Sequence, residues 1–185
     1  GRSGWAYDQT AVVADLHTGK LHRETAWQRF LPNGPLAFLP LQDGRVSLVW
    51  STTPDEAASL QASSEAEFSE RVSIASDHVL GEGTLASGRA GFPLALWHAR
   101  AYVQPRLALV GDAAHTIHPL AGQGVNLGFL DCASLVQVLA AASAKGEELH
   151  GLRVLRRYER WRRSENAVVM GACDTINRLF TDKSV

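Results

Sequence analysis

One segment, Arg106 to Asn126, constrains the fold more than any other part of the chain, because it joins an apolar strand to a glycine-opened helix through one carboxylate. A strand is predicted over residues 107–110. Gly111 then lets the backbone turn, and Asp112 places an acceptor at the carboxyl end of the strand. Open α/β sheets bind ligands at that end of their strands, so we expect a ligand site beside a parallel sheet.

The second half of the segment predicts a helix start that attracts anions. Pro119 stiffens the approach, and Gly122–Gln123–Gly124 exposes successive backbone N–H groups where the helix begins. The first turn of a helix carries unsatisfied amides and partial positive charge, which attract negatively charged groups. Together with Asp112, this start indicates a site for a flat ligand that is polar at one edge.

Three pieces of the segment resemble the second flavin-binding motif of the aromatic hydroxylases related to p-hydroxybenzoate hydroxylase: Gly111–Asp112, His118–Pro119 and Gly122–Gln123–Gly124–Val125–Asn126. Upstream, the runs 7–14, 26–30, 34–41 and 49–51 resemble the middle domain of the members that hydroxylate polyprenylated phenols in ubiquinone biosynthesis. The resemblance extends from about Trp5 to about Arg163.

The resemblance implies which residues bind FAD. The Asp112 carboxylate would hold the ribityl hydroxyls, and the backbone from Gly122 to Asn126 would face the pyrimidine edge of the isoalloxazine ring. A reduced flavin carries negative charge at this edge, which a helix N-terminus stabilises by about 0.3–1 kcal/mol when exposed. The implied cofactor-binding residues are Gly111, Asp112, Pro119, Gly122, Gln123, Gly124, Val125 and Asn126.

The resemblance also implies an activity, the hydroxylation of a polyprenylated phenol with NAD(P)H and O2 on the way to ubiquinone. Because a flavin carries out the difficult chemistry itself, we assign no catalytic residue to the protein. Two alternatives stay open: a hydroxylase of a small soluble aromatic compound, and a catalytically inert module for lipid binding or subunit contact.

One half of the expected cofactor site has no counterpart in the sequence. The family begins with a strand, a G-x-G-x-x-G turn and a helix that hold the adenosine diphosphate half of FAD. A similar run at 81–86 follows residues 71–78, which are typical of a helix end rather than a strand, so the required context is missing. We therefore expect a fragment that lacks the N-terminal FAD-binding part and holds FAD weakly or not at all.

Composition narrows the partners and the compartment. A net charge of -1 argues against nucleic-acid binding, which needs a strongly basic face. Cys132 and Cys173, both in helical stretches, fit packed thiols in a reducing compartment. No apolar run is seen to approach the roughly 20 residues of a membrane span. We expect a cytoplasmic protein, soluble or peripheral to the inner membrane, with a complex of ubiquinone-biosynthesis proteins or a second copy as further partners.

The first half of the chain predicts an antiparallel sheet with covering helices. Alternating patterns predict strands at 10–17, 26–31, 36–41 and 46–51, and a strand-like passage follows at 83–103. Capping boxes at 53–56 and 64–67 predict two helices that end before His78. Apolar positions spaced three and four apart predict a long last helix, 152–180.

These elements indicate an α+β protein in three parts. The parts are a substrate domain with an antiparallel or mixed sheet over 5–102, a returning Rossmann-like piece of the FAD domain over 103–144, and a C-terminal helical segment over 151–181.

Histidine and aspartate side chains near the segment have structural and metal-binding interpretations. His115 and His118 lie three residues apart near Asp112, but a metal needs a third fixed donor, and the sequence does not place His98 there. We therefore favour structural roles for both, bonding loop carbonyls beside the flavin edge, and assign no metal site. Asp131 is expected to be exposed or to act as a capping partner.

Aromatic and basic residues also have two interpretations. Trp27, Trp50 and Trp97, with Phe30 and Phe38, would line an apolar pocket or fill the core, and the core is favoured. Arg29 would meet a phenolate or a flavin phosphate, or lie on the surface. Six arginines between 153 and 163 would contact phosphates, an anionic membrane or an acidic partner, or form a solvated helix face, which we favour.

Overall fold

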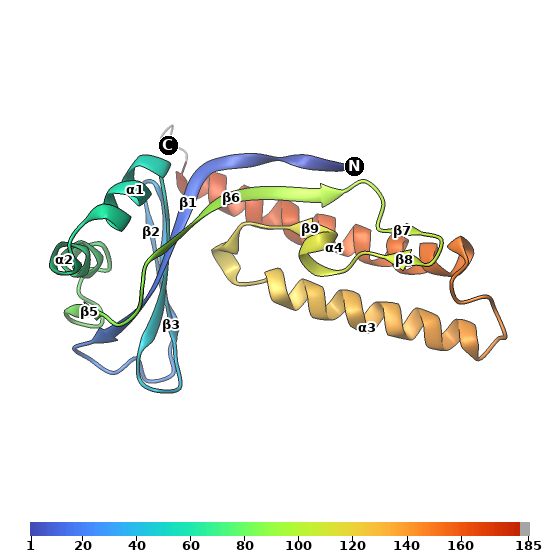
Figure 1. Cartoon of the computed structure of the whole chain (residues 1–185), viewed down its shortest axis with the longest axis horizontal. Helices are drawn as coiled ribbons and strands as arrows, with labels where there is room; N and C mark the ends of the chain where they lie inside the picture. Colours follow the sequence, from blue (N-terminus) through green and yellow to red (C-terminus); the bar gives the residue numbers. More distant parts are fainter. Residues whose placement is uncertain (182–185) are drawn as a thin grey trace. The chain divides into compact units, whose positions relative to one another are not determined.

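The computed structural model describes residues 1–181 and divides them into two compact units (Figure 1). Unit 1 comprises residues 1–7 and 95–177, and unit 2 comprises residues 8–94 with the end of the last helix from Arg178. The strands β1 (Arg2–Thr18) and β6 (Ala90–Ala99) each contribute to both units. The segment 106–126 lies entirely in unit 1.

Unit 2 is built on an antiparallel sheet. β1 pairs with β4 (Val46–Thr52), β4 with β3 (Gly34–Pro40) and β3 with β2 (Trp27–Leu31). β5 (Gly83–Leu85) extends the pairing at the far end of β1. The four predicted strands are confirmed, although β1 begins well before residue 10 because its first residues pair outside unit 2.

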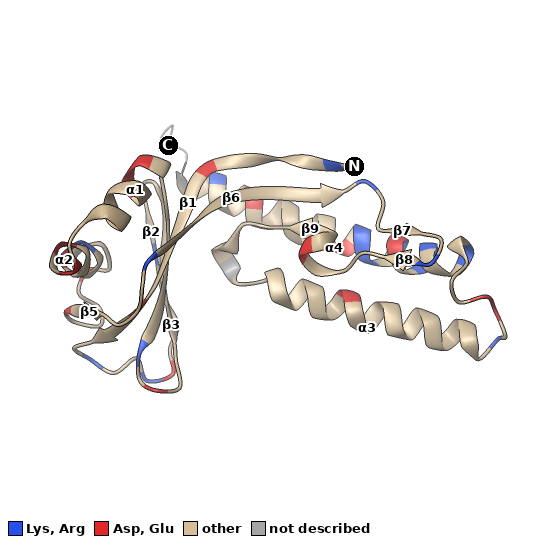
Figure 2. Ribbon diagram, in the orientation of Figure 1, with Lys and Arg blue, Asp and Glu red and all other residues tan. Residues whose placement is uncertain are grey.

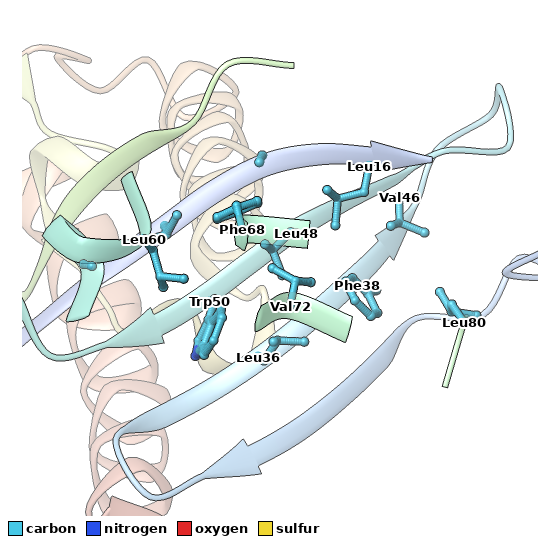
Figure 3. Close-up of a cluster of buried hydrophobic side chains, with 13 residues drawn as sticks. Leu16, Leu36, Phe38, Val46, Leu48, Trp50, Leu60, Phe68, Val72 and Leu80 are labelled. Atoms are coloured by element: carbon cyan, nitrogen blue, oxygen red, sulfur yellow. The ribbon is translucent and has the colours of Figure 1, made fainter. Parts of the chain in front are cut away.

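Two helices cover one face of this sheet. α1 (Pro54–Ala62) and α2 (Glu65–Ala75) are capped as predicted: the Thr53 and Ser64 side chains accept hydrogen bonds from the amides of Glu56 and Glu67. Residues from both helices and three strands fill the core between them (Figure 3), including Val12, Leu16, Phe38, Leu48, Trp50, Leu60, Phe68 and Val72. Trp50 and Phe38 are therefore core residues, and Phe38 also lines a cavity described below.

The opposite face of the sheet carries the alternate residues of the same strands. Val13 lies opposite Val49, and Val49 lies opposite Ala37, so small and branched apolar side chains form a continuous row. Leu39 and Phe30, farther along this face, are 43% and 38% exposed. The Phe30 ring stacks on the ring of Phe180, with 4.1 Å between the centroids, so it is partly covered. We call Val13, Ala37, Leu39 and Val49 the open sheet face.

Unit 1 contains two long helices, α3 (Gly124–Ser143) and α4 (Leu152–Thr181). Before α3 the chain forms a hairpin of β7 (Val103–Gln104) and β8 (Leu107–Ala108), then β9 (His115–Thr116), which pairs with β6. Two short 3-10 turns, η1 (Gly111–Ala113) and η2 (Pro119–Ala121), flank β9. The α+β class is confirmed, with a mostly antiparallel sheet.

The prediction of a parallel strand at 107–110 is wrong. Only Leu107–Ala108 is a strand, and it pairs antiparallel with β7, where Val103 lies opposite Ala108. Two parallel strands must be joined by a long crossover connection, whereas antiparallel strands can be joined by a short turn. Here a tight turn through Arg106, whose φ is +67°, places β7 next to β8.

α3 also corrects the expectation about membrane spans. By length and composition alone, α3 is long and apolar enough to cross a membrane. The same criterion is met by a helix packed inside a folded protein. Figure 2 shows an acidic position midway along α3, which is Asp131, and its partners within unit 1 are described below.

Candidate functional site

A cavity of about 610 Å³ lies where η1, η2 and the first turns of α3 meet. Its size is typical of small-molecule sites. Six of the eight predicted cofactor-binding residues line it, namely Gly111, Asp112, Pro119, Gly122, Gly124 and Val125. The other lining residues are Val110, Thr116, Ile117, Gly128, Phe129 and Cys132.

Gln123 and Asn126 are not part of this lining. The Asn126 Nδ2 donates to Gln123 Oε1 at 3.3 Å, so these two side chains bond each other across the first turn of α3.

The start of α3 supplies backbone donors to this region. The N-cap residue Gln123 makes no side-chain capping bond, and the first intrahelical bond runs from the Leu127 amide to the Gln123 carbonyl at 3.0 Å. The amides of Gly124, Val125 and Asn126 therefore precede the helical ladder and need other acceptors. The Gly122 amide is used within the protein, because it donates to the Pro119 carbonyl at 3.0 Å.

Two glycines give the cavity its backbone shape. Gly111 and Gly122 have φ of +57° and +60°, the left-handed region that L residues with a Cβ rarely adopt. A Cβ placed on Gly122 or Gly124 would meet no atom within 4 Å, so the absent side chains open the cavity rather than permit protein packing.

Asp112 is the only carboxylate in the lining, and its side chain is exposed. Around it, Val110, Ile117, Val125 and Phe129 supply apolar surface. The cavity thus combines one anionic acceptor, a set of backbone donors and apolar walls. A flat ring with polar edges and a hydroxylated chain matches this combination of groups.

A buried polar cluster lies beside the cavity, and sequence reasoning missed it. Asp131, expected to be exposed or to act as a capping partner, is 0% exposed and accepts hydrogen bonds from Arg162 Nε at 2.8 Å and Asn166 Nδ2 at 3.1 Å. Its other oxygen meets His115 Nε2 at 2.6 Å and the Gly111 amide at 3.0 Å. We call Asp131, His115, Arg162 and Asn166 the Asp131 cluster.

The cluster keeps Asp131 charged. Burial alone would raise the pKa of Asp131, but hydrogen bonds from His115, Arg162, Asn166 and the Gly111 amide lower this pKa to about 2. Arg162 is buried as well, which corrects the expectation of a solvated face for this one arginine. A single carboxylate within an otherwise uncharged apolar helix was the sequence signal for the cluster.

Both histidines of the segment have structural roles, as expected, but with different partners. His115 bonds the Asp131 carboxylate, and the His118 Nδ1 accepts the Leu120 amide at 3.1 Å, so neither of these bonds is to a loop carbonyl. Burial lowers the pKa of His118 to about 4, against the opposing effect of the Asp174 charge. Among residues 1–181, no group of three or more candidate ligands that could hold a metal ion gathers.

The other candidate residues lie elsewhere. Trp27 and Arg29 line a separate cavity of about 280 Å³ within unit 2. The Arg29 guanidinium donates to the Ala75 carbonyl at 3.1 Å, which accords with the surface interpretation. The Arg2 guanidinium carbon lies over the Trp97 ring, 4.5 Å from the ring centroid.

Of the two free thiols, Cys173 is buried as expected, whereas Cys132 is exposed.

Known proteins with similar sequences carry names from ubiquinone biosynthesis. A family profile described as FAD binding domain matches residues 6–170. Ubiquinone biosynthesis monooxygenase COQ6, mitochondrial, of Rattus norvegicus is 41% identical over 212 residues, covering 96% of this chain and 44% of that protein. The 3-demethoxyubiquinol 3-hydroxylase of Escherichia coli (strain K12) is 43% identical over 183 residues, covering 98% and 46%. The chain spans about half the length of the curated relatives that it matches.

Solved structures share the fold. PqsL, a probable FAD-dependent monooxygenase from Pseudomonas aeruginosa, has a TM-score of 0.78 at 24% identity, over 97% of this chain and 50% of that chain. The p-nitrophenol 4-monooxygenase PnpA from Pseudomonas putida DLL-E4 has a TM-score of 0.75 at 20% identity, over 100% and 46%. At these identities the likeness shows the fold alone.

Proposed function

Because this chain belongs to the FAD binding domain family, we propose that it forms part of a flavin-dependent monooxygenase that hydroxylates a polyprenylated phenol with NAD(P)H and O2. The observation that carries the proposal is the cavity at the start of α3, which Asp112, Gly124 and Val125 line together. The proposal assigns FAD to this cavity.

The residues present fit the isoalloxazine and ribityl part of FAD. The open space over Gly122 and Gly124 accommodates a ring plane that a side chain at either position would block. Asp112 is an acceptor for ribityl hydroxyls, and the first amides of α3 are donors for the pyrimidine edge. Gln123 and Asn126 remain candidates through their backbone groups, because their side chains are engaged with each other.

When bound, the flavin supplies the activation of dioxygen and the transfer of oxygen to the ring. The chain's own residues perform the remaining tasks. The α3 amides stabilise negative charge at the ring edge, and Asp112 anchors the ribityl chain. Ile117, Val125 and Phe129 give the site apolar walls. No protein nucleophile is part of this scheme.

Two observations support a substrate with a long apolar tail. One of the two relatives named above is called a ubiquinone biosynthesis monooxygenase, and the other a 3-demethoxyubiquinol 3-hydroxylase. In addition, the open sheet face of unit 2 presents Val13, Ala37 and Val49 without an intervening charge, and apolar surface of this kind stabilises a prenyl chain. A pocket for a small phenolic acid would instead need a charged partner such as arginine, and the one arginine lining the cavity of about 280 Å³ in unit 2, Arg29, already donates to the Ala75 carbonyl.

The test uses the longest natural protein that contains this chain. Purified protein is incubated with FAD, NADH or NADPH, oxygen and a polyprenylated phenol, and the product is analysed by mass spectrometry. We expect a gain of one oxygen on the prenylated phenol and little product from a short-chain phenol at the same concentration. Hydroxylation of the short phenol alone would favour the small-aromatic alternative, and a protein that binds no flavin would contradict the proposal.

We also propose peripheral contact with an anionic membrane, because a prenylated substrate resides in lipid. Arg153, Arg156, Arg160 and Arg163 are exposed and lie three and four residues apart along α4, a spacing that places them on one face of a helix. Figure 2 shows that α4 carries several basic positions. The neighbouring Glu159 carboxylate is engaged by the Tyr102 amide at 2.6 Å. Sedimentation with anionic but not zwitterionic vesicles, weakened by salt, tests this contact.

A further inference from the structure

The turn that carries Asp112 is held from the protein interior by a second carboxylate. The Gly111 amide donates to Asp131 Oδ2 at 3.0 Å, and Asp131 does not line the cavity. α3 therefore acts on the site twice: its first turn contributes backbone groups to the cavity, and its middle holds the turn η1.

Each oxygen of this buried carboxylate has two partners. Oδ1 faces the Arg162 guanidinium and the Asn166 amide nitrogen, and Oδ2 faces the His115 ring and the Gly111 amide. The side chain cannot rotate without losing several of these bonds while it stays buried. Its orientation is therefore fixed from α4 and β9, and the Gly111 amide is fixed with it.

Arg162 is itself held in place. Its side chain is 2% exposed, one terminal nitrogen donates to Asn166 Oδ1 at 2.7 Å, and the other is paired with Glu165. A chain of contacts thus runs from α4 through Arg162 and Asp131 to Gly111, the residue before Asp112.

The backbone at this point tolerates little movement. Gly111 has a left-handed φ, and a Cβ added to Gly128 would lie 3.4 Å from the Gly111 Cα, so α3 passes directly against the turn. Because packing and the Asp131 bond act on the same residue, the direction in which Asp112 leaves the turn depends on both.

We propose that Asp131, oriented by Arg162, is a positioning residue that fixes the η1 turn so that the Asp112 carboxylate faces the cavity. The identity of the ligand rests on the proposed function above. The hold on the turn itself does not, and it exists in the protein without flavin.

The test compares two double variants in the longest natural protein. Asp131→Leu with Arg162→Met removes the carboxylate without leaving an unpaired buried charge, and such replacements often preserve folding. The matched control, Glu147→Leu with Arg157→Met, removes a bidentate pair of the same unit, joined at 3.1 and 2.6 Å, that does not line the cavity.

Two readouts separate positioning from simple stabilisation. In flavin-free protein, hydrogen exchange of the amides at 110–113 should become at least tenfold faster in the Asp131/Arg162 variant and stay unchanged in the control. The dissociation constant for FAD, from flavin fluorescence, should rise at least tenfold in the first variant only, with similar unfolding midpoints for both.

Exchange at 110–113 that matches the wild type would overturn the proposal. Faster exchange spread evenly over α3 and α4, with a matching loss of unfolding midpoint, would also overturn it, because the cluster would then only stabilise unit 1. If the wild type binds no FAD, the proposed function fails, while the exchange data still decide whether Asp131 holds the turn.

Discussion

Asp112 is the only carboxylate among the residues that line the cavity, so its effect on a ligand can be isolated by substitution. Asp112→Ala should weaken FAD binding by about 10-fold to 100-fold, because a hydrogen bond to a charged group contributes about 1.5–3 kcal/mol. The dissociation constant is measured by flavin fluorescence. Asp55→Ala removes an equally exposed aspartate from α1 and serves as the control. Unchanged flavin content would remove the role assigned to Asp112.

His118 gives the protein a measurable dependence on pH. Burial lowers its pKa from the model-compound value of 6.5 to about 4, so the unfolded chain binds a proton that the folded chain excludes. Stability should therefore fall as the pH is lowered from about 6.5 toward about 4, by up to about 3 kcal/mol. Burial lowers the pKa of His98 too, which acts in the same direction.

The variant His118→Asn separates this contribution, because asparagine is also a good N-cap and can accept the Leu120 amide. Urea unfolding at several pH values should show a smaller loss on acidification for the variant than for the wild type. Equal slopes would mean that His118 is not the responsible group.

At the scale of elements, the sequence predicted the helices and strands that depend on neighbouring residues. It did not predict the pairings that depend on residues far along the chain. The capping residues Thr53 and Ser64 and the alternation along β4 act within a few residues, so the sequence alone located α1, α2 and the antiparallel strands. The strand at 107–110 depends on a neighbour, and the neighbour turned out to be β7. The lone carboxylate in α3 was a local signal for Asp131, but its partner Arg162 lies 31 positions along the chain, so the sequence did not predict the pairing.

The start of α3 permits a substitution that separates folding from ligand binding. Gly124→Ala adds a methyl group that meets no protein atom within 4 Å, so the free energy of unfolding should be unchanged or rise by up to about 1 kcal/mol. The same methyl group enters the cavity, so FAD affinity should fall. Gly171→Ala, within α4 and equally unobstructed, should stabilise the helix without changing affinity. Equal FAD affinities for both variants would place the flavin elsewhere.

At the scale of the whole molecule, α3 carries exposed apolar residues beside the cavity. Val125, Phe129, Leu130 and Val136 are 52–69% exposed on a helix whose other face is buried. Exposed apolar patches of this kind drive contact with another surface. The 185-residue chain, expressed alone, should therefore self-associate as its concentration rises. Sedimentation velocity at several concentrations measures this directly.

Polar substitutions on the exposed face of α3 should reverse the association, because they remove the apolar side chains that cause it. They leave the buried face and the Asp131 cluster intact, so the fold should be preserved. Leu130→Gln with Val136→Gln should shift the protein toward a 20.0 kDa monomer, since both side chains are more than half exposed. Ile74→Gln, which removes a comparably exposed apolar residue from α2, should leave the association unchanged. A wild-type chain that stays monomeric at every concentration would contradict the prediction. The exposed apolar residues of α3 would then have a role in ligand binding and none in self-association.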